Sequence, residues 1–148
     1  MSFIQSIKDV YAKLGSKVTM PDITLLWMRF WVAGIFYKSG RTKAGEGYLE
    51  LNSFTPDLFE YEHPVPGLDA ETAAQLALYG ETFLPLMLIF GIASRFAAVG
   101  LLVMTAVIQL VMPQLWADHI VWAAALAGVL MMGPGKISLD AFVGPRLK

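Results

Sequence analysis

Residues 72–92, TAAQLALYGETFLPLMLIFGI, decide the fold of this chain. Apolar residues dominate the stretch, and Glu81 is its one charged residue. A helix of about 20 apolar residues crosses the hydrocarbon core of a bilayer, which is about 30 Å thick. The stretch therefore predicts a transmembrane helix that carries a carboxyl group inside the membrane.

Three further stretches, residues 23–40, 96–112 and 116–132, are also long and apolar enough to cross a bilayer. Of the whole chain, 56% is hydrophobic and only 16% is charged, whereas soluble domains carry about 25% charged residues. We therefore expect an all-α protein of 148 residues that forms one domain, a four-transmembrane-helix bundle.

Two segments outside the four spans are expected to lie at the membrane surface. An N-terminal amphipathic interfacial helix is predicted by apolar residues that recur every three or four positions, with lysines opposite: Phe3, Ile7, Val10, Tyr11 and Leu14. Residues 41–70 are polar and acidic, but leucines and aromatic residues give them apolar mass. We expect this outer segment to lie across the bundle as a lid; the alternative is a mobile loop in solvent.

Lysine and arginine are divided unequally between the two sides of the predicted membrane. The outer segment holds only Arg41 and Lys43 among many acidic residues. The others outside the spans lie on the side of the two termini: Lys8, Lys13, Lys17, Arg95, Lys136, Arg146 and Lys148. Because positively charged loops remain in the cytoplasm, we expect both termini to be cytoplasmic.

The composition excludes several classes of function. The chain has no cysteine, which removes disulfides, thiolate metal sites and Fe–S clusters. A net charge of −1 without a basic stripe argues against nucleic acid. Haem b held by two histidines would need both His63 and His119, and a metal could be held by Glu81, His119 and Asp118 or Glu62, but no ligand spacing supports either. We expect no metal and no resident cofactor.

Four polar side chains, Lys38, Glu81, Gln109 and His119, lie in four different spans at a similar depth. Counted from the cytoplasmic ends of the spans, each lies roughly 21–22 Å above the inner boundary. A charged group at that depth is costly unless it is paired. We therefore predict one polar chamber in the outer half of the bundle, in which Lys38 and Glu81 neutralise each other.

The chamber has a structural and a functional interpretation. The ion pair could merely fix the helix register, or the cluster could bind a ligand or handle protons, as intramembrane ionisable groups often do. Asp118 could orient the imidazole of His119 or belong to the headgroup region. Arg29 lies on the helix face opposite Lys38, so we place it outside the chamber, where it snorkels to headgroups or reaches Asp140.

Motifs spread over residues 25–140 resemble the DoxX family. They include Phe36-Tyr37-Lys38-Ser39-Gly40, Glu81, Arg95, His119, Trp122 and the closing Gly133-Pro134-Gly135 with Ser138-Leu139-Asp140. The resemblance implies a small multi-pass protein of the bacterial cytoplasmic (inner) membrane. Namesake relatives are membrane subunits of a thiosulfate:quinone oxidoreductase, and mycobacterial relatives are described as partners of a superoxide dismutase and a sulfurtransferase. We assign structural roles to Arg29, Arg95, Gly133, Pro134, Gly135 and Asp140.

The first functional hypothesis is a membrane subunit of a redox or oxidative-stress system that binds a quinone. Glu81 or His119 would take the proton and Lys38 and Gln109 would donate to the oxygens, with aromatic side chains beside the ring: Trp122, Tyr37 and Tyr79. A soluble or membrane partner protein would supply or remove the electrons, so catalysis by this chain alone is not expected. The alternatives are a small-molecule transport or binding protein, for which a homo-oligomer would be required, and a membrane scaffold for a soluble redox enzyme.

Overall fold

The structure, a computed structural model, describes residues 18–143 of the 148-residue chain. The predicted N-terminal amphipathic helix lies outside the described residues. Within residues 18–143 the fold is helical, as the sequence predicts, and the nearest approach to a strand is one bridge between Ala44 and Leu51.

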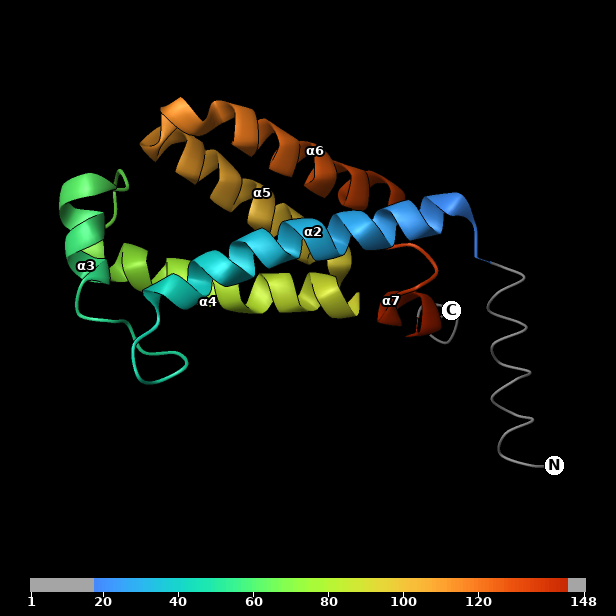
Figure 1. Ribbon diagram of the computed structural model, residues 1–148, viewed down its shortest axis with the longest axis horizontal. Helices are drawn as coiled ribbons and strands as arrows, with labels where there is room; N and C mark the ends of the chain where they lie inside the picture. Colours follow the sequence, from blue (N-terminus) through green and yellow to red (C-terminus); the bar gives the residue numbers. More distant parts are fainter. Residues whose placement is uncertain (1–17, 144–148) are drawn as a thin grey trace.

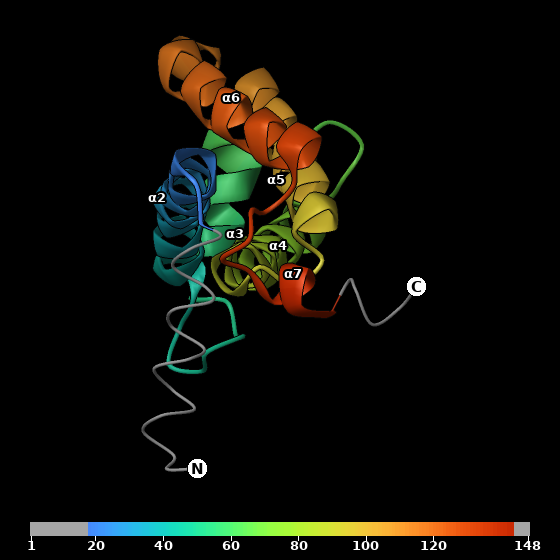
Figure 2. The same cartoon turned by 90° about the vertical axis from the view of Figure 1, so that its right-hand side faces the viewer.

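Four long helices build the described part of the chain into a bundle: α2 (Met20–Lys43), α4 (Ala70–Phe90), α5 (Ser94–Val111) and α6 (Trp116–Met132). Figure 2 looks along this bundle, and Figure 1 shows it from the side. Helix α2 packs against α4 and α6, and α5 packs between α4 and α6. Three shorter elements lie in the connections between them: α3 (Thr55–Asp57), the π-helical turn η1 (Leu58–Glu62) and the 3₁₀ turn η2 (Pro113–Leu115). A further short helix, α7 (Leu139–Val143), follows α6.

Three of the described helices are long and apolar enough to cross a membrane: Ala70–Phe90, Ser94–Val111 and Pro113–Met132. Helix α2 is long enough to cross a membrane, but charged side chains such as Arg29 and Lys38 lower its overall hydrophobicity. Its membrane crossing, and with it the fourth span, therefore stays a prediction. Many large apolar side chains on the bundle surface are exposed, which fits contact with lipid.

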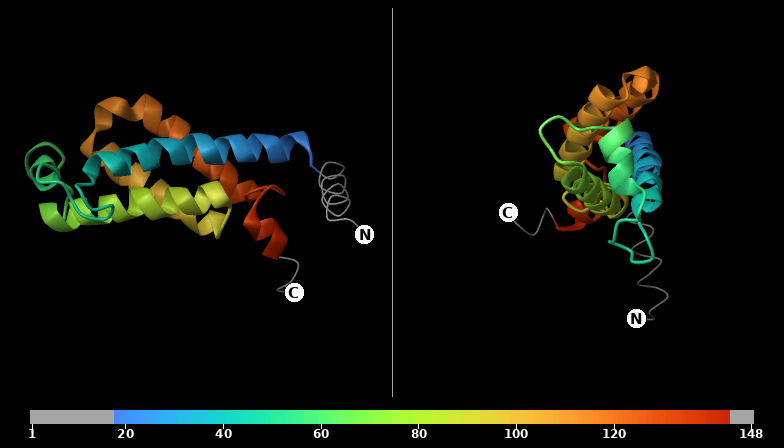
Figure 3. Two further views of the ribbon diagram at one scale, coloured as in Figure 1. Left: turned by 60° about the horizontal axis from the view of Figure 1, so that its bottom comes forward. Right: turned by 90° about the vertical axis from the view of Figure 1, so that its left-hand side faces the viewer.

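The two ends of the bundle are built differently. At one end, which we call the α3 end, α2 finishes, α4 begins, and α3 with η1 lies across the bundle (Figure 3). At the other, the α7 end, α7 lies near the junction of α4 and α5 (Figure 1). The apolar core fills the space between the two ends, and its fully buried side chains come from all four helices: Val32, Phe36, Leu88, Leu101, Leu126 and Val129.

Arg29 ties α2 to the α7 end from inside the bundle. Its side chain is 1% exposed. The guanidinium donates four hydrogen bonds of 2.8–2.9 Å to backbone carbonyls, those of Leu88, Ile89, Pro134 and Ile137. The expected position in the headgroups is therefore wrong, whereas Asp140 lies near enough to act on the guanidinium through its charge. The last carbonyls of a helix lack partners in the helix itself, and Arg29 supplies donors to two of them at the end of α4.

Asp140 closes the α7 end by capping α5. Its carboxylate accepts hydrogen bonds from the backbone nitrogens of Ala93 at 2.8 Å and Ser94 at 2.9 Å, and from the Ser94 hydroxyl at 2.8 Å. Ala93 adopts the left-handed conformation, with φ of 44°. Gly133 and Gly135 also have positive φ, which lets the Gly133-Pro134-Gly135 segment turn back toward Arg29. Arg95 is exposed and lies beside Gly133.

Candidate functional site

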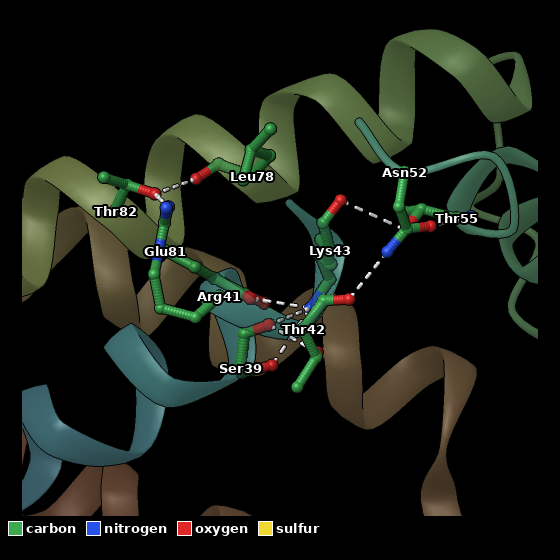
Figure 4. Close-up of polar contacts among 9 residues, drawn as sticks. All are labelled: Ser39, Arg41, Thr42, Lys43, Asn52, Thr55, Leu78, Glu81 and Thr82. Carbon is green, nitrogen blue, oxygen red and sulfur yellow. Dashed lines mark hydrogen bonds and ion pairs between the residues drawn. The ribbon is translucent and has the colours of Figure 1, made fainter. Parts of the chain in front are cut away.

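A buried ion pair joins α2 to the middle of α4. The Lys43 ammonium lies 2.6 Å from Oε2 of Glu81, and the exposed fractions of the two side chains are 12% and 4% (Figure 4). Lys43 also donates to the Ser39 hydroxyl at 3.0 Å. A carboxylate at this depth is costly without a partner, so the short distance explains how α4 can bury Glu81.

Gly40 allows the helix contact on which this pair depends. A Cβ atom at Gly40 would lie 2.9 Å from Cβ of Glu81 and 3.0 Å from its carbonyl oxygen. Such distances are shorter than van der Waals contact, so only glycine permits α2 and α4 to approach this closely. The predicted first span ends at Gly40, but α2 continues through this residue to Lys43.

The predicted pair of Lys38 and Glu81 is wrong, because Lys43 is the partner of Glu81. Lys38 is exposed. At about 100° per residue, Lys38 lies roughly 200° around α2 from the buried Phe36. Phe36, Gly40 and Lys43 follow the i, i+4, i+7 spacing of one helix face, and that face meets α4. The prediction used rotation only to separate Arg29 from Lys38, and it chose Lys38 by its depth along the helix.

One ring nitrogen of His119 is hydrogen-bonded to Gln109, and the other has no partner within residues 18–143. Its Nδ1 lies 2.7 Å from Oε1 of Gln109. The other side of the Gln109 amide donates from Nε2 to the carbonyl oxygen of Pro113 at 3.4 Å. His119 is 2% exposed, and its Nε2 is buried without a hydrogen bond. Because buried polar atoms are nearly always paired, this nitrogen indicates a place for a ligand or water.

A cavity of about 510 Å³ connects His119 with the ion pair near the α3 end. Glu81, Lys43 and His119 contribute its polar surface together with Ser39, Thr42 and His63. Its other walls are apolar and come from α2, α4, α5, α6 and the outer segment, including Phe36, Ala77, Met104, Ile108, Leu58, Phe59, Val65, Leu68 and Trp122. The outer segment therefore covers part of the cavity, as expected of a lid.

Trp122 forms a wall of the cavity next to His119. The centroid of its ring lies 4.9 Å from that of His119 and 5.5 Å from that of Phe36. Gln109 contacts His119 from outside the cavity lining. Asp118 is exposed in the first turn of α6, and Gln109 orients the imidazole in its place. Of the two alternatives for Asp118, the position in the headgroup region is the one that its exposure fits.

Tyr37 and Tyr79, which we had placed beside a ligand ring, lie outside the cavity lining. The Tyr37 hydroxyl lies 2.6 Å from that of Tyr48, and this hydrogen bond raises the pKa of Tyr48 above its usual value. Arg41 stacks 4.0 Å above the Tyr48 ring and donates to the hydroxyl of Thr82. This cluster fastens the turn after α2 to α4, and it does not enter the cavity.

The contacts within the outer segment explain why it holds its position. Asn52 donates from its side chain to the carbonyl oxygen of Thr42 at 2.8 Å and from its backbone to that of Lys43 at 3.0 Å (Figure 4). The Thr55 hydroxyl donates to the same Lys43 carbonyl at 3.3 Å. The segment thus supplies donors to the end of α2, where helix carbonyls lack partners.

The described part of the chain contains no cluster of side chains that could bind a metal ion. Among residues 18–143, no three histidine, aspartate or glutamate side chains come together in a way that could hold a metal ion. His119 and Glu81 line the same cavity, but Asp118 is exposed.

The arrangement offers three chemical features to a bound molecule. The cavity walls favour an apolar body, the Lys43–Glu81 pair supplies fixed opposite charges, and Nε2 of His119 supplies an unpaired polar atom. Sequence reasoning missed Lys43 and Ser39. The spacing of Phe36, Gly40 and Lys43 on one helix face was the signal that could have found them.

Comparison with known proteins identifies a matching family and a similar protein. The model of the DoxX family matches residues 24–114. The chain is also similar to a Haemophilus influenzae protein described as uncharacterized, with 26% identity over 133 residues that cover 82% of this chain and 83% of that protein. No solved structure matches the chain.

Proposed function

Because the chain belongs to the DoxX family, we propose that it is a multi-pass protein of the bacterial inner membrane and the membrane subunit of a redox or oxidative-stress system. Its termini lie in the cytoplasm, and the α3 end faces the outside. Its site binds a quinone or a related small, lipid-soluble ring in the cavity near that end. The charge distribution around the predicted spans supports this orientation.

The observation that carries the proposal is the cavity itself. Ligand pockets usually measure about 300–1,000 Å³ and combine apolar walls with a few convergent polar groups. The cavity of about 510 Å³ falls within this range, and its polar groups come from three different helices. A buried ion pair that only fixed helix register would leave unexplained why His119, which lines the same cavity, has a buried nitrogen without a hydrogen-bond partner.

The residues around the cavity fit a quinone-type ring. Trp122 and Phe36 supply aromatic walls, and Lys43, Glu81 and His119 line the same cavity. A bound quinone would supply the capacity to carry electrons and protons. The chain binds and orients the ring, keeps it away from bulk water under the outer segment, and holds polar groups at its edge.

Electron transfer in this proposal needs a second protein. A soluble or membrane-bound redox partner would supply or remove the electrons, and the cavity would be the quinone site of their complex. A non-redox binding or transport protein is the second candidate, because an apolar cavity beside a buried ion pair would equally admit a lipid-soluble substrate. Transport would require a homo-oligomer that lets the site open to either side.

Quinone retention by the purified protein tests the proposal. The protein is extracted in a mild detergent and washed, and its lipid-soluble molecules are identified by mass spectrometry. We expect a quinone at a substantial fraction of one per chain, and rebinding when quinone is added to stripped protein. A protein that retains no quinone and binds none on addition would contradict the redox proposal. Retention of another lipid-soluble molecule alone would favour the binding or transport protein.

A further inference from the structure

The hydrogen bonds around His119 determine which of its nitrogens carries the proton. A backbone carbonyl oxygen can only accept, so the Gln109 amide must turn its NH₂ group toward Pro113. This orientation places the amide oxygen against Nδ1 of His119 at 2.7 Å. Because an amide oxygen also only accepts, Nδ1 must be the nitrogen that donates.

The neutral imidazole then has a bare nitrogen in a side chain that lines the cavity. With the proton on Nδ1, Nε2 holds a lone pair and acts as a hydrogen-bond acceptor. This nitrogen is buried, lies in a side chain that is 2% exposed, and has no partner among the described residues. A ligand that occupies the cavity can satisfy Nε2 only by offering a donor.

The other charged groups of the cavity do not supply that donor. The Lys43 ammonium is engaged by Glu81 at 2.6 Å and by Ser39 at 3.0 Å. The carboxylate of Glu81 is itself an acceptor. His119 therefore requires a hydrogen-bond donor from the part of the ligand next to it. A carbonyl oxygen placed there would face the lone pair of Nε2.

We propose that the cavity selects a ring that bears a hydroxyl group, such as a phenol or the reduced quinol form, over the matching ketone or ether, and that the hydroxyl donates to Nε2 of His119. The inference rests on the proposed function of the same site and adds the chemical form of its ligand. His119 is the specificity-determining residue, and Gln109 is a positioning residue that acts through it.

The first test reads the tautomer directly. Nitrogen NMR of protein with labelled histidine, with His119 assigned through the His119→Phe variant, reports which ring nitrogen carries the proton. We expect the proton on Nδ1, and a loss of this preference in the Gln109→Met variant. A ring protonated at Nε2 in the wild-type protein would overturn the inference.

The second test compares three probes with the same ring substitution: a methyl-substituted hydroquinone, its dimethyl ether and the corresponding benzoquinone. We expect the hydroquinone to bind the wild-type protein about tenfold more tightly than the other two, as one additional hydrogen bond to a buried acceptor allows. In His119→Phe, which keeps the apolar wall, the three affinities should converge. Equal affinities in the wild-type protein would overturn the hydroxyl preference but leave the proposed site intact, whereas no binding of any probe would overturn both.

Discussion

The Lys43 ammonium lies 2.6 Å from the Glu81 carboxylate and joins the last residue of α2 to the middle of α4. Removing one partner of a buried pair typically costs about 3–5 kcal/mol, because the other charge stays buried without compensation. We therefore expect Lys43→Met to lower the free energy of unfolding by about 3 kcal/mol, measured by denaturant titration in detergent.

Lys38→Met is the matched control for this change, because Lys38 is exposed on the same helix. It should alter stability by no more than about 0.5 kcal/mol. The double variant Lys43→Met with Glu81→Leu removes both charges and should recover most of the loss. A larger effect at Lys38 than at Lys43 would contradict the assigned pair.

We expect the Gly40→Ala variant to be destabilised, because the site has no room for even one added methyl group. A Cβ atom there would lie 2.9 Å from Cβ of Glu81 and 3.0 Å from its carbonyl oxygen, and overpacking of this kind costs about 1–3 kcal/mol. Gly34 in the same helix has nothing within 4 Å of such an atom, so Gly34→Ala should stabilise the helix by up to about 1 kcal/mol. Thermal unfolding of the two variants should move in opposite directions, and a shift of both in one direction would refute the close contact.

Arg29 should be irreplaceable by lysine despite the retained charge. Its guanidinium satisfies four backbone carbonyls, whereas an ammonium has three donors without the planar geometry of arginine. We expect Arg29→Lys to cost about 2 kcal/mol, since unsatisfied buried polar groups cost about 1–3 kcal/mol each. The control Arg95→Lys changes an exposed side chain and should leave the unfolding midpoint almost unchanged. Equal midpoints for the two variants would argue against the role of Arg29.

Ala93 is a site where glycine should improve stability. Its φ of 44° lies in the left-handed region, which costs a residue with a Cβ atom about 1–2 kcal/mol. Ala93→Gly should therefore raise the free energy of unfolding by about 1 kcal/mol, while Ala106→Gly in the exposed face of α5 should lower it by a similar amount. A destabilised Ala93→Gly variant would show that this turn is not strained.

The sequence predicts the helices well because hydrophobic length alone defines them. The predicted stretch 116–132 coincides with α6, and the others differ from the observed helices by a few residues at their ends. The gathering of Glu81 and His119 around one cavity also matches the depth argument. The fourth membrane crossing, by α2, remains a prediction, because length is satisfied there but apolarity is not.

The partner of Glu81 was mispredicted for a physical reason. The first span was ended at Gly40 because a polar, acidic segment begins at Arg41, yet α2 continues to Lys43 and lies against Glu81 at Gly40. Arg29 was misplaced for a related reason. Arg29 and Lys38 were correctly assigned to opposite faces of the helix, but the face of Arg29 was not recognised as the one that meets the bundle. Rotation, and not depth, decides which polar side chains of a helix enter a bundle.

Ligand binding by a variant with a filled cavity tests the central claim most directly. Ala77 lines the cavity, whereas Ala124 is exposed on the surface of α6, so Ala77→Phe and Ala124→Phe add the same group inside and outside the site. The affinity for a methyl-substituted hydroquinone is measured by titration of both variants in lipid nanodiscs, with unfolding midpoints as the check on folding. A loss of at least about tenfold in Ala77→Phe alone, with folding preserved, is the result predicted by a ligand site between Lys43, Glu81 and His119. Unchanged affinity in a folded Ala77→Phe protein would contradict it.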